Sequence, residues 1–204
     1  MDKLWNALTA VARVAIWGGG AMLFAAAGIV TAEVLLRKGV GAIVGTGIVF
    51  SGSDEISGYL FAVGTSWSMA HVLVMRGHVR IDALYGRFSP KLRAWLDLVA
   101  LLMLGIFVGT LLERAWDVSW GSYTDVIRSN TNLRIWLAWP QLPWFAGIAF
   151  FFLVLVVAFL RALLATLRGD YTAAAAIVGV PSQDEEIETE LKGLGIETAG
   201  HKKD

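Results

Sequence analysis

Four long apolar segments, separated by shorter polar ones, dominate the hydrophobic pattern of this chain. They cover about residues 14–36, 57–75, 92–112 and 143–167. An α-helix crosses the hydrocarbon core of a bilayer with about 20 residues, and each segment is close to that length or longer. The pattern predicts an all-α integral membrane protein with four transmembrane helices. Residues 1–170 would form the membrane domain and residues 171–204 an acidic cytoplasmic tail.

The composition agrees with this prediction. Hydrophobic residues make up 56% of the chain and charged residues 17%, and the mean hydropathy is +0.62. Soluble domains average roughly 45–50% apolar and about 25% charged residues. The first apolar segment is too long for the hydrophobic region of a secretory signal peptide. The chain has no cysteine, which excludes disulfides and thiolate metal sites.

The positions of lysine and arginine predict the orientation. Most of them lie before the first segment, between the second segment and the start of the third, at the end of the fourth, and in the tail: Lys3, Arg13, Arg76, Arg80, Arg87, Lys91, Arg93, Arg161, Arg168, Lys192, Lys202 and Lys203. Short cytoplasmic loops are enriched in lysine and arginine. We therefore expect both termini to be cytoplasmic.

Tryptophans bracket the connection between the third and fourth segments, on the side opposite the termini. They are Trp116, Trp120, Trp136, Trp139 and Trp144. Indole rings favour the level of the lipid headgroups, so these residues are predicted interfacial anchors. Within this connection, residues 123–138 mix apolar and polar positions. Two interpretations remain open, a short interfacial helix and an irregular loop anchored by the tryptophans.

A glycine-rich apolar stretch, residues 39–53, comes after the first segment. It has neither the flanking strand and helix nor the Lys-Ser/Thr pair of a phosphate-binding loop. We expect it to dip into the interface or to pack against a partner, since backbone at membrane depth must be covered by protein. Asp54 and Glu55 come next and suit the N-terminus of the second helix, where the helix dipole favours negative charge.

Small residues mark two candidate packing faces, which hold either other helices of this chain or another subunit. Small side chains let membrane helices approach closely. In the second segment they recur every four positions, and in the third they form a GxxxG pair: Gly58, Ala62, Ser66 and Ala70, then Gly105 and Gly109.

Ionisable residues inside the apolar segments are few: Glu33, His71, Asp97 and Glu113. Such residues are costly in hydrocarbon and are functional candidates by default. Local pairing, for instance of Glu33 with Arg37 at i,i+4, is the expected role. The chain lacks a metalloprotease motif, a nucleophile elbow and histidines placed for haem. We expect no catalytic residue, no cofactor, no metal and no nucleic-acid partner.

The connection between the second and third segments is short, basic and interrupted by glycine. Gly77 is expected to end the second helix in the left-handed region, and Asp82 to cap the next amphipathic segment. Either an interfacial helix or a solvated basic loop would then suit residues 81–88. In the tail, Ser182 and Glu185 form a capping box that opens a predicted short acidic helix.

Several of these features occur together in one family. They are Glu33-x-x-x-Arg37, Asp54-Glu55, Trp67, the string Arg76-Gly77-His78-Val79-Arg80-Ile81-Asp82, Pro90, Trp139-Pro140 and Pro143. Over about residues 20–168 the chain resembles the small membrane subunit of tripartite ATP-independent periplasmic (TRAP) transporters, the DctQ type. It departs from the family pattern at Lys38, where an aromatic residue often follows the arginine, and in the long stretch 39–53.

The resemblance implies a non-catalytic subunit in the inner membrane of a bacterium, surrounded by membrane lipids. In that family a large elevator-type membrane subunit, the DctM type, moves a carboxylate-bearing solute with sodium. A periplasmic binding protein delivers the solute, and the small subunit braces the large one. Residues 39–53 and 116–144 would then be candidates for contact with the binding protein. The alternative is a self-sufficient four-helix membrane protein, either a homo-oligomeric transporter or a scaffold of another complex.

Overall fold

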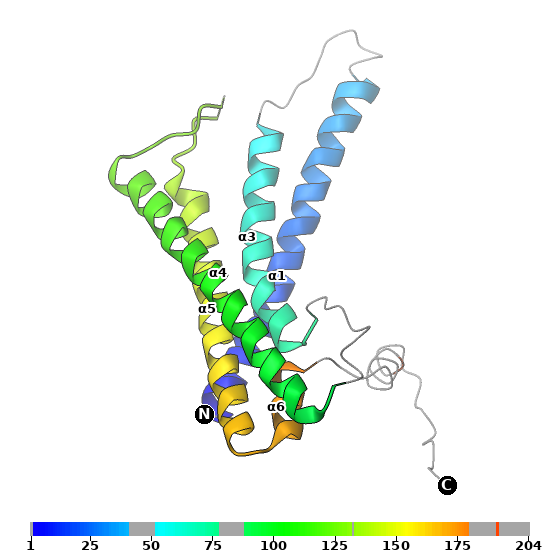
Figure 1. Ribbon diagram of the computed structural model, residues 1–204. Helices are drawn as coiled ribbons and strands as arrows, with labels where there is room; N and C mark the ends of the chain where they lie inside the picture. The colour runs from blue at the N-terminus through cyan, green and yellow to red at the C-terminus, as the bar shows by residue number, and fades with distance from the viewer. Residues whose placement is uncertain (1, 41–51, 78–87, 132, 180–190, 192–204) are drawn as a thin grey trace.

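The computed structural model describes residues 2–40, 52–77, 88–131, 133–179 and 191. Its elements are α1 (Asp2–Leu35), a π-helical turn η1 (Leu36–Val40), α3 (Ser53–Val74), α4 (Pro90–Thr124), α5 (Ala138–Leu167) and α6 (Tyr171–Val178), as Figure 1 shows. Among the described residues, β-type pairing is limited to one bridge between Arg128 and Trp136. The predicted all-α fold is confirmed.

Among the described residues, three helices are long and apolar enough to cross a membrane. They are α1 extended to Gly39, α4 and α5. The second predicted segment also forms one helix, the 22-residue α3, but its serine, threonine, glycine and acidic residues dilute its apolar character. The part of the chain that the structure describes therefore contains three candidate spans, and the crossing of the bilayer by α3 stays a prediction.

The first and third long helices extend well beyond the predicted segments. α1 has 34 residues and α4 has 35, which is about 50 Å of helix at about 1.5 Å per residue. α1 begins at Asp2, and its early residues Leu8 and Ala12 are buried. α4 continues to Thr124 and buries Ala115 and Ser119. These extra turns are stabilised by packing within the protein, which a search for long apolar segments does not detect.

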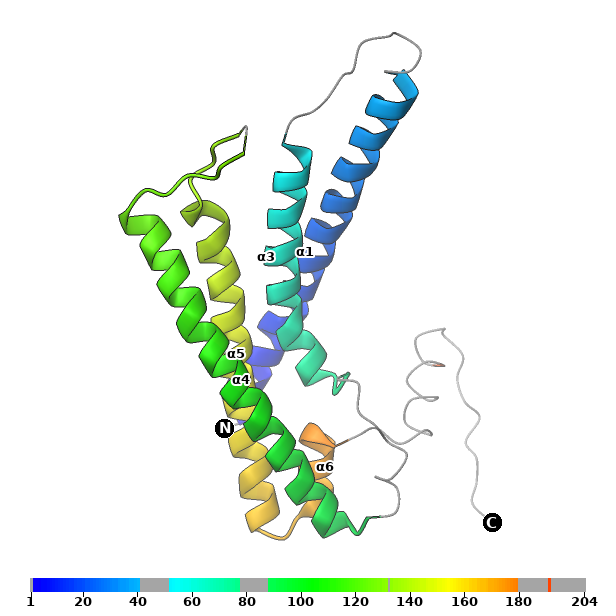
Figure 2. The same cartoon turned by 45° about the horizontal axis from the view of Figure 1, so that its top comes forward.

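The long helices run alternately up and down (Figures 1 and 2). α3 packs against α1 and α5, and α5 also packs against α4 and α6. The pairs α1/α3 and α4/α5 meet at the lower end of Figure 1 and diverge toward the upper end. We use "lower end" for the end that holds the N-terminus and the end of α5, and "upper end" for the opposite one. The predicted orientation makes the lower end cytoplasmic.

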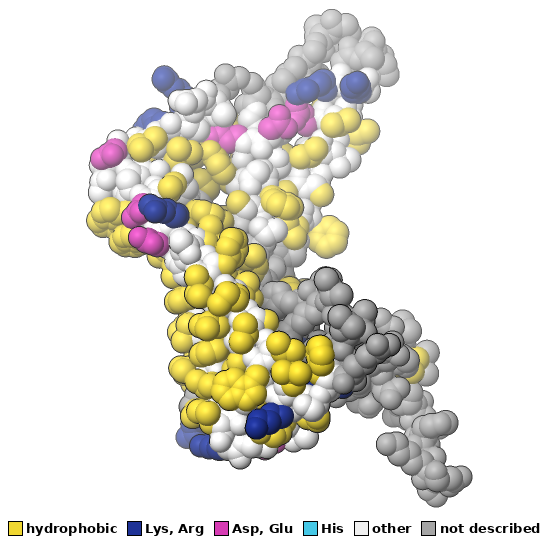
Figure 3. All heavy atoms as spheres, in the orientation of Figure 1, with side chains coloured by type: hydrophobic (Ala, Val, Ile, Leu, Met, Phe, Trp, Pro, Cys, Tyr) yellow, Lys and Arg dark blue, Asp and Glu magenta, His cyan; other side chains and the backbone are white. Residues whose placement is uncertain are grey.

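The core lies around α5. Its buried side chains include Ile148, Phe151, Val154 and Leu155, and the facing Leu101 of α4 is 2% exposed. Of the 18 most apolar consecutive residues in each helix, 39% are buried in α5 but only 17% in α1. Figure 3 shows apolar side chains covering the middle of one face, with charged ones toward both ends. α5 is thus the central helix and α1 the most exposed one.

The contact between α1 and α3 is a backbone-to-backbone approach at two glycines. A Cβ atom on Gly19 would lie 2.5 Å from the carbonyl oxygen of Gly64 and would also strike the Ser68 hydroxyl. A Cβ atom on Gly64 would lie 2.8 Å from the carbonyl oxygen of Gly19. Only glycine fits at either position, so this crossing fixes the spacing of the first helix pair.

The short helix α6 folds back onto the lower ends of α5 and α4 and buries Ala174 and Val178. Gly169, at φ +78°, makes the turn that precedes it. The Asp170 carboxylate then caps α6 by accepting from the Ala173 amide at 2.9 Å and the Thr172 hydroxyl at 2.8 Å. These bonds, that of the Ala173 amide above all, lower the pKa of Asp170. The sequence pattern did not predict this helix, and the division into domains at residue 170 stays a prediction.

The glycine crossing can be tested with neighbouring substitutions on one helix. Gly19→Ala should lower the thermal stability of the detergent-solubilised chain, because overpacking typically costs about 1–3 kcal/mol. Gly20→Ala is the matched control, since a Cβ atom there meets nothing within 4 Å. It should leave the melting temperature unchanged or raise it, because alanine favours the helix. Equal melting temperatures for the two variants would contradict the crossing.

Candidate functional site

A polar network joins α1 to α3 at the upper end. The Glu33 side chain is buried, at 5% exposure. It forms an ion pair with Arg37 one turn further on and accepts a hydrogen bond from the hydroxyl of Ser53, which is 1% exposed. The predicted Glu33–Arg37 pair is confirmed, and the third member, Ser53, comes from the start of α3. A buried carboxylate with two partners ties the two helix ends together.

Glu55 connects α3 to the loop between α4 and α5. Its carboxylate accepts hydrogen bonds from the Tyr59 hydroxyl at 2.6 Å and from the Thr131 hydroxyl. Thr131 in turn bonds Ser129 at 2.8 Å. Asp54 and Glu55 do lie in the first turn of α3, as the sequence predicted. The structure adds that Glu55 bonds a segment more than 70 residues further along the chain.

The loop itself, residues 125–137, is irregular in its described part. A bridge between Arg128 and Trp136 closes it, and the Leu133 side chain packs so closely on Gly52 that a Cβ atom there would clash. The interpretation of residues 123–138 as a short interfacial helix is wrong, and the irregular-loop interpretation holds. The two positive-φ residues Val126 and Arg134 are incompatible with a continuous helix.

Trp67 links α3 to α5. Its indole Nε1 donates a hydrogen bond to the Pro143 carbonyl at 2.9 Å, and its ring stacks on Phe150 with centroids 6.1 Å apart. Pro143 lies inside α5, where it removes one backbone donor and commonly bends a helix. The predicted family residue Trp67 therefore holds the second helix against the middle of the bundle.

The predicted interfacial tryptophans fall into three groups. A continuous row of aromatic rings runs from Phe145 through Trp116, Trp120 and Tyr123 to Trp136, with successive centroids 5.2–5.6 Å apart. The Phe145–Trp116 pair is tilted, and the other pairs are stacked. Trp144 packs against the core, and Trp139 is 73% exposed. Trp116 and Trp120 belong to α4 and Trp139 and Trp144 to α5, so the connection is shorter than the tryptophans suggested. Trp139 is the most exposed of the five, and Trp116 and Trp120 are also exposed, at 44% and 48%.

The predicted small-residue faces serve different contacts. Ser66 and Ala70 are buried, and a Cβ atom on Gly147 of α5 would lie 2.9 Å from the Ser66 Cβ. Gly105 and Gly109 lie where added Cβ atoms would be 3.2 Å from Leu155 and 3.5 Å from Phe152. Those contacts are within the chain. Gly58 differs, because nothing lies within 4 Å of the position of its Cβ, and Ala62 is half-buried.

Gly58 lines an open groove of about 700 Å³ between the upper halves of α1 and α3. Asp54 and Ser57 lie at its upper rim. The rest of its lining is small or apolar: Leu23, Ala26, Ala27, Val30, Thr31 and Phe61. The neighbouring surface of α1 exposes large apolar side chains, including Trp17 at 79% and Phe24 at 83%. This groove, defined by the residues just named, is a concave surface that the described part of the chain leaves uncovered.

The lower end of α3 closes with a turn in which Arg76, not Gly77, takes the left-handed conformation. Arg76 has φ +57°, its amide bonds the Leu73 carbonyl, and the Gly77 amide bonds the Val72 carbonyl at 3.0 Å. This is a Schellman turn shifted by one residue from the prediction. Arg76 Nη1 donates to the Ala175 carbonyl of α6 at 3.3 Å, which offsets the cost of positive φ. His78 and Asp82 lie outside the described residues, as do the tail helix and most of residues 39–53.

Long apolar helices packed through small residues, with polar networks confined to their ends, define a multi-pass membrane protein. The chain belongs to the DctQ family: the family model "Tripartite ATP-independent periplasmic transporters, DctQ component" matches residues 26–165. The protein is therefore a membrane component of a TRAP transporter. Comparison with curated proteins and with solved structures gave no significant match.

Several contact residues were not predicted from the sequence. Ser53, Thr131 and the carbonyl of Pro143 complete networks around predicted residues, but their partners are distant in sequence. Gly19 and Gly64 belong to no GxxxG pair. The run of three glycines at 18–20 was the available signal, since glycine is unfavourable inside a helix without a packing reason.

The Glu55–Thr131 contact can be tested by proteolysis. Thr131→Val keeps the shape of the side chain but removes the donor to Glu55, so the loop should open more often and trypsin should cleave after Arg128 or Arg134 several-fold faster. Thr110→Val is the matched control, because the Thr110 hydroxyl bonds the Ile106 carbonyl in its own helix. If the two variants and the wild type are cleaved at one rate, Thr131 does not hold the loop.

Proposed function

We propose that the chain is the small, non-catalytic subunit that braces the large elevator-type DctM subunit of a TRAP transporter. The assembly would take up a carboxylate-bearing solute with sodium, delivered by a periplasmic binding protein. In this proposal the chain lies in a bacterial inner membrane with both termini in the cytoplasm. The groove between α1 and α3 is the observation that carries it.

The groove suits a large, fixed protein partner. Its lining of alanine, glycine and short polar side chains lets another helix approach closely, which is how membrane helices associate without hydrophobic contrast. Adjacent Trp17 and Phe24 supply apolar area around it. A helix of the partner that packed in the groove would lie against both α1 and α3, on the side of this helix pair that the described chain leaves uncovered.

The internal contacts support a rigid role. The two glycines fix α1 on α3, Trp67 fixes α3 on α5, and Glu33 and Glu55 fix the upper helix ends. A subunit of this kind gives a moving partner a constant surface. The loop 125–137, held at the upper end, is a candidate contact for the binding protein.

The alternative is a self-sufficient small membrane protein, and reconstitution separates the two proposals. The chain purified alone into liposomes should show no sodium-driven solute uptake, whereas liposomes with the large subunit and the binding protein should show it. Uptake by the isolated chain would overturn the bracing proposal.

The groove is tested by filling it. Gly58→Leu places a side chain in open space, so the chain should still fold, but copurification of the large subunit should fall by about tenfold or more, as for central interface positions. Gly121→Leu is the matched control, since Gly121 on α4 also has nothing near its Cβ position. Full recovery of the complex with Gly58→Leu would exclude the groove as the seat of the partner.

The absence of native cysteine makes the orientation directly measurable. Asn130→Cys in the upper loop should react with a membrane-impermeant maleimide in cells whose outer membrane is permeabilised. Lys3→Cys at the start of α1 should react only after the inner membrane is opened. The reverse pattern would invert the topology.

A further inference from the structure

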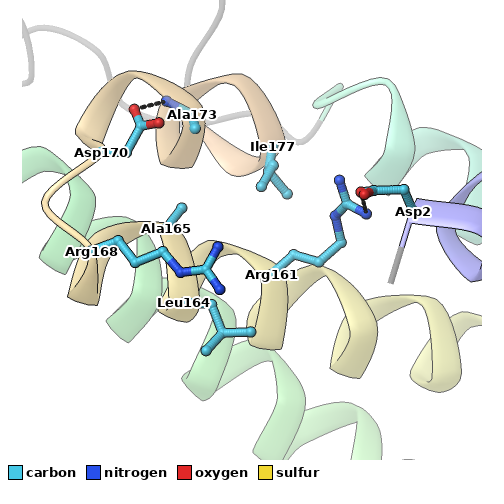
Figure 4. A pocket seen from close by; sticks show the side chains of 8 residues that line it. All are labelled: Asp2, Arg161, Leu164, Ala165, Arg168, Asp170, Ala173 and Ile177. Carbon is cyan, nitrogen blue, oxygen red and sulfur yellow. Dashed lines mark hydrogen bonds and ion pairs between the residues drawn. The ribbon is translucent and has the colours of Figure 1, made fainter.

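A pocket of about 400 Å³ lies at the lower end, between α5, α6 and the start of α1 (Figure 4). Its volume is within the range of about 300–1,000 Å³ that is usual for small-molecule sites. Arg161 and Arg168 line it from α5, and Ile177 closes it from α6. The bracing role and the groove between α1 and α3 make no use of this pocket.

Arg161 is held in place along one side of the pocket. Its Nη1 donates to the Asp2 carboxylate at 2.8 Å, and its guanidinium lies 5.3 Å from the centre of the Trp5 ring. Its Nε is buried and has no hydrogen-bond partner among the described residues. A buried guanidinium N–H without an acceptor is uncommon and costs free energy.

Arg168 lies two turns further along the same face of α5. Figure 4 shows its side chain extended over the pocket toward Arg161. Within the described part of the chain, no carboxylate or carbonyl accepts a hydrogen bond from its guanidinium. The pocket therefore holds one arginine with a spare buried donor and a second whose donors are all available.

Two carboxylates also line the pocket, and both are engaged. Asp2 pairs with Arg161. Asp170 accepts from the Ala173 amide and the Thr172 hydroxyl at the start of α6, which holds it away from Arg168. Their charges lower the attraction for an anion without cancelling the arginine donors, so Arg168 is the uncompensated cation of this pocket.

We propose that the pocket binds a phosphate group, supplied by the headgroup of an anionic phospholipid. Arginine presents a planar fork of donors that matches phosphate oxygens. Leu160, Leu164 and Leu167 lie on the adjoining face of α5 and are 44%, 39% and 65% exposed. In the predicted membrane placement, this exposed apolar face would meet the acyl chains of a lipid whose headgroup occupies the pocket. Basic pockets between helices at the cytoplasmic side favour anionic lipid, whereas a free phosphate would gain nothing from these leucines.

The test uses the full chain in detergent micelles and measures bound lipid by native mass spectrometry. The wild type should bind phosphatidylglycerol in preference to phosphatidylcholine. Arg168→Gln should weaken the binding of phosphatidylglycerol by about fivefold, the effect of removing one basic contact to an anionic surface. Arg114→Gln is the control, because Arg114 is exposed at the upper end and pairs with Asp117 at 3.8 Å.

Arg161 also packs on Trp5, so Arg168 carries the test, and circular dichroism establishes that Arg168→Gln is folded. Equal binding of the two lipids by the wild type, or undiminished binding of phosphatidylglycerol by Arg168→Gln, would overturn the proposal. Inorganic phosphate added at the same concentration as the lipid should not displace it. Displacement would overturn the lipid as the source and make the ligand a free anion.

Discussion

Close approach of helix backbones is the constraint on which the rest of this structure depends. Lipid tails are as apolar as leucine, so burying apolar area against another helix gives little net driving force in a bilayer. Helices that meet at glycine come close enough for van der Waals attraction and hydrogen bonds between them, and these interactions hold the helices together. Gly19 and Gly64 bring α1 and α3 together, and Gly147 lets the Ser66 and Trp67 side chains reach α5. With α3 fixed between its neighbours in this way, its polar residues meet their distant partners.

The same constraint explains why the helix pairs diverge toward the upper end. Gly19 and Gly64 lie near the middle of α1 and α3, and toward the upper end the pairs α1/α3 and α4/α5 diverge from each other (Figures 1 and 2). Hydrogen bonds and aromatic contacts hold the helices there: Glu33 with Ser53, Glu55 with Thr131, and the row of rings from Phe145 to Trp136. In the predicted membrane placement this level lies near water and headgroups, where polar side chains are tolerated.

How much could be predicted from the sequence depends on the range of each interaction. The apolar segments and the Glu33–Arg37 pair depend on near neighbours. Each segment falls on one long helix of the structure, although α1 and α4 extend well beyond theirs, and the ion pair is present. The bond from Trp67 to Pro143 joins residues 76 positions apart, and no local pattern encodes it. The shift of the left-handed residue from Gly77 to Arg76 has the same cause, since Arg76 bonds α6, a helix that packs against α5 and α4 far along the chain.

The first turn of α3 connects the groove, the upper polar network and the upper loop. Successive residues of a helix point about 100° apart, so three consecutive residues face three directions. Ser53 bonds Glu33 on α1, Asp54 lies at the rim of the groove, and Glu55 bonds the loop 125–137. A partner helix seated in the groove would therefore contact the same turn that positions the upper loop. Any displacement of that turn by the partner would be passed to the loop through Glu55, which gives the two proposed docking surfaces a short physical connection.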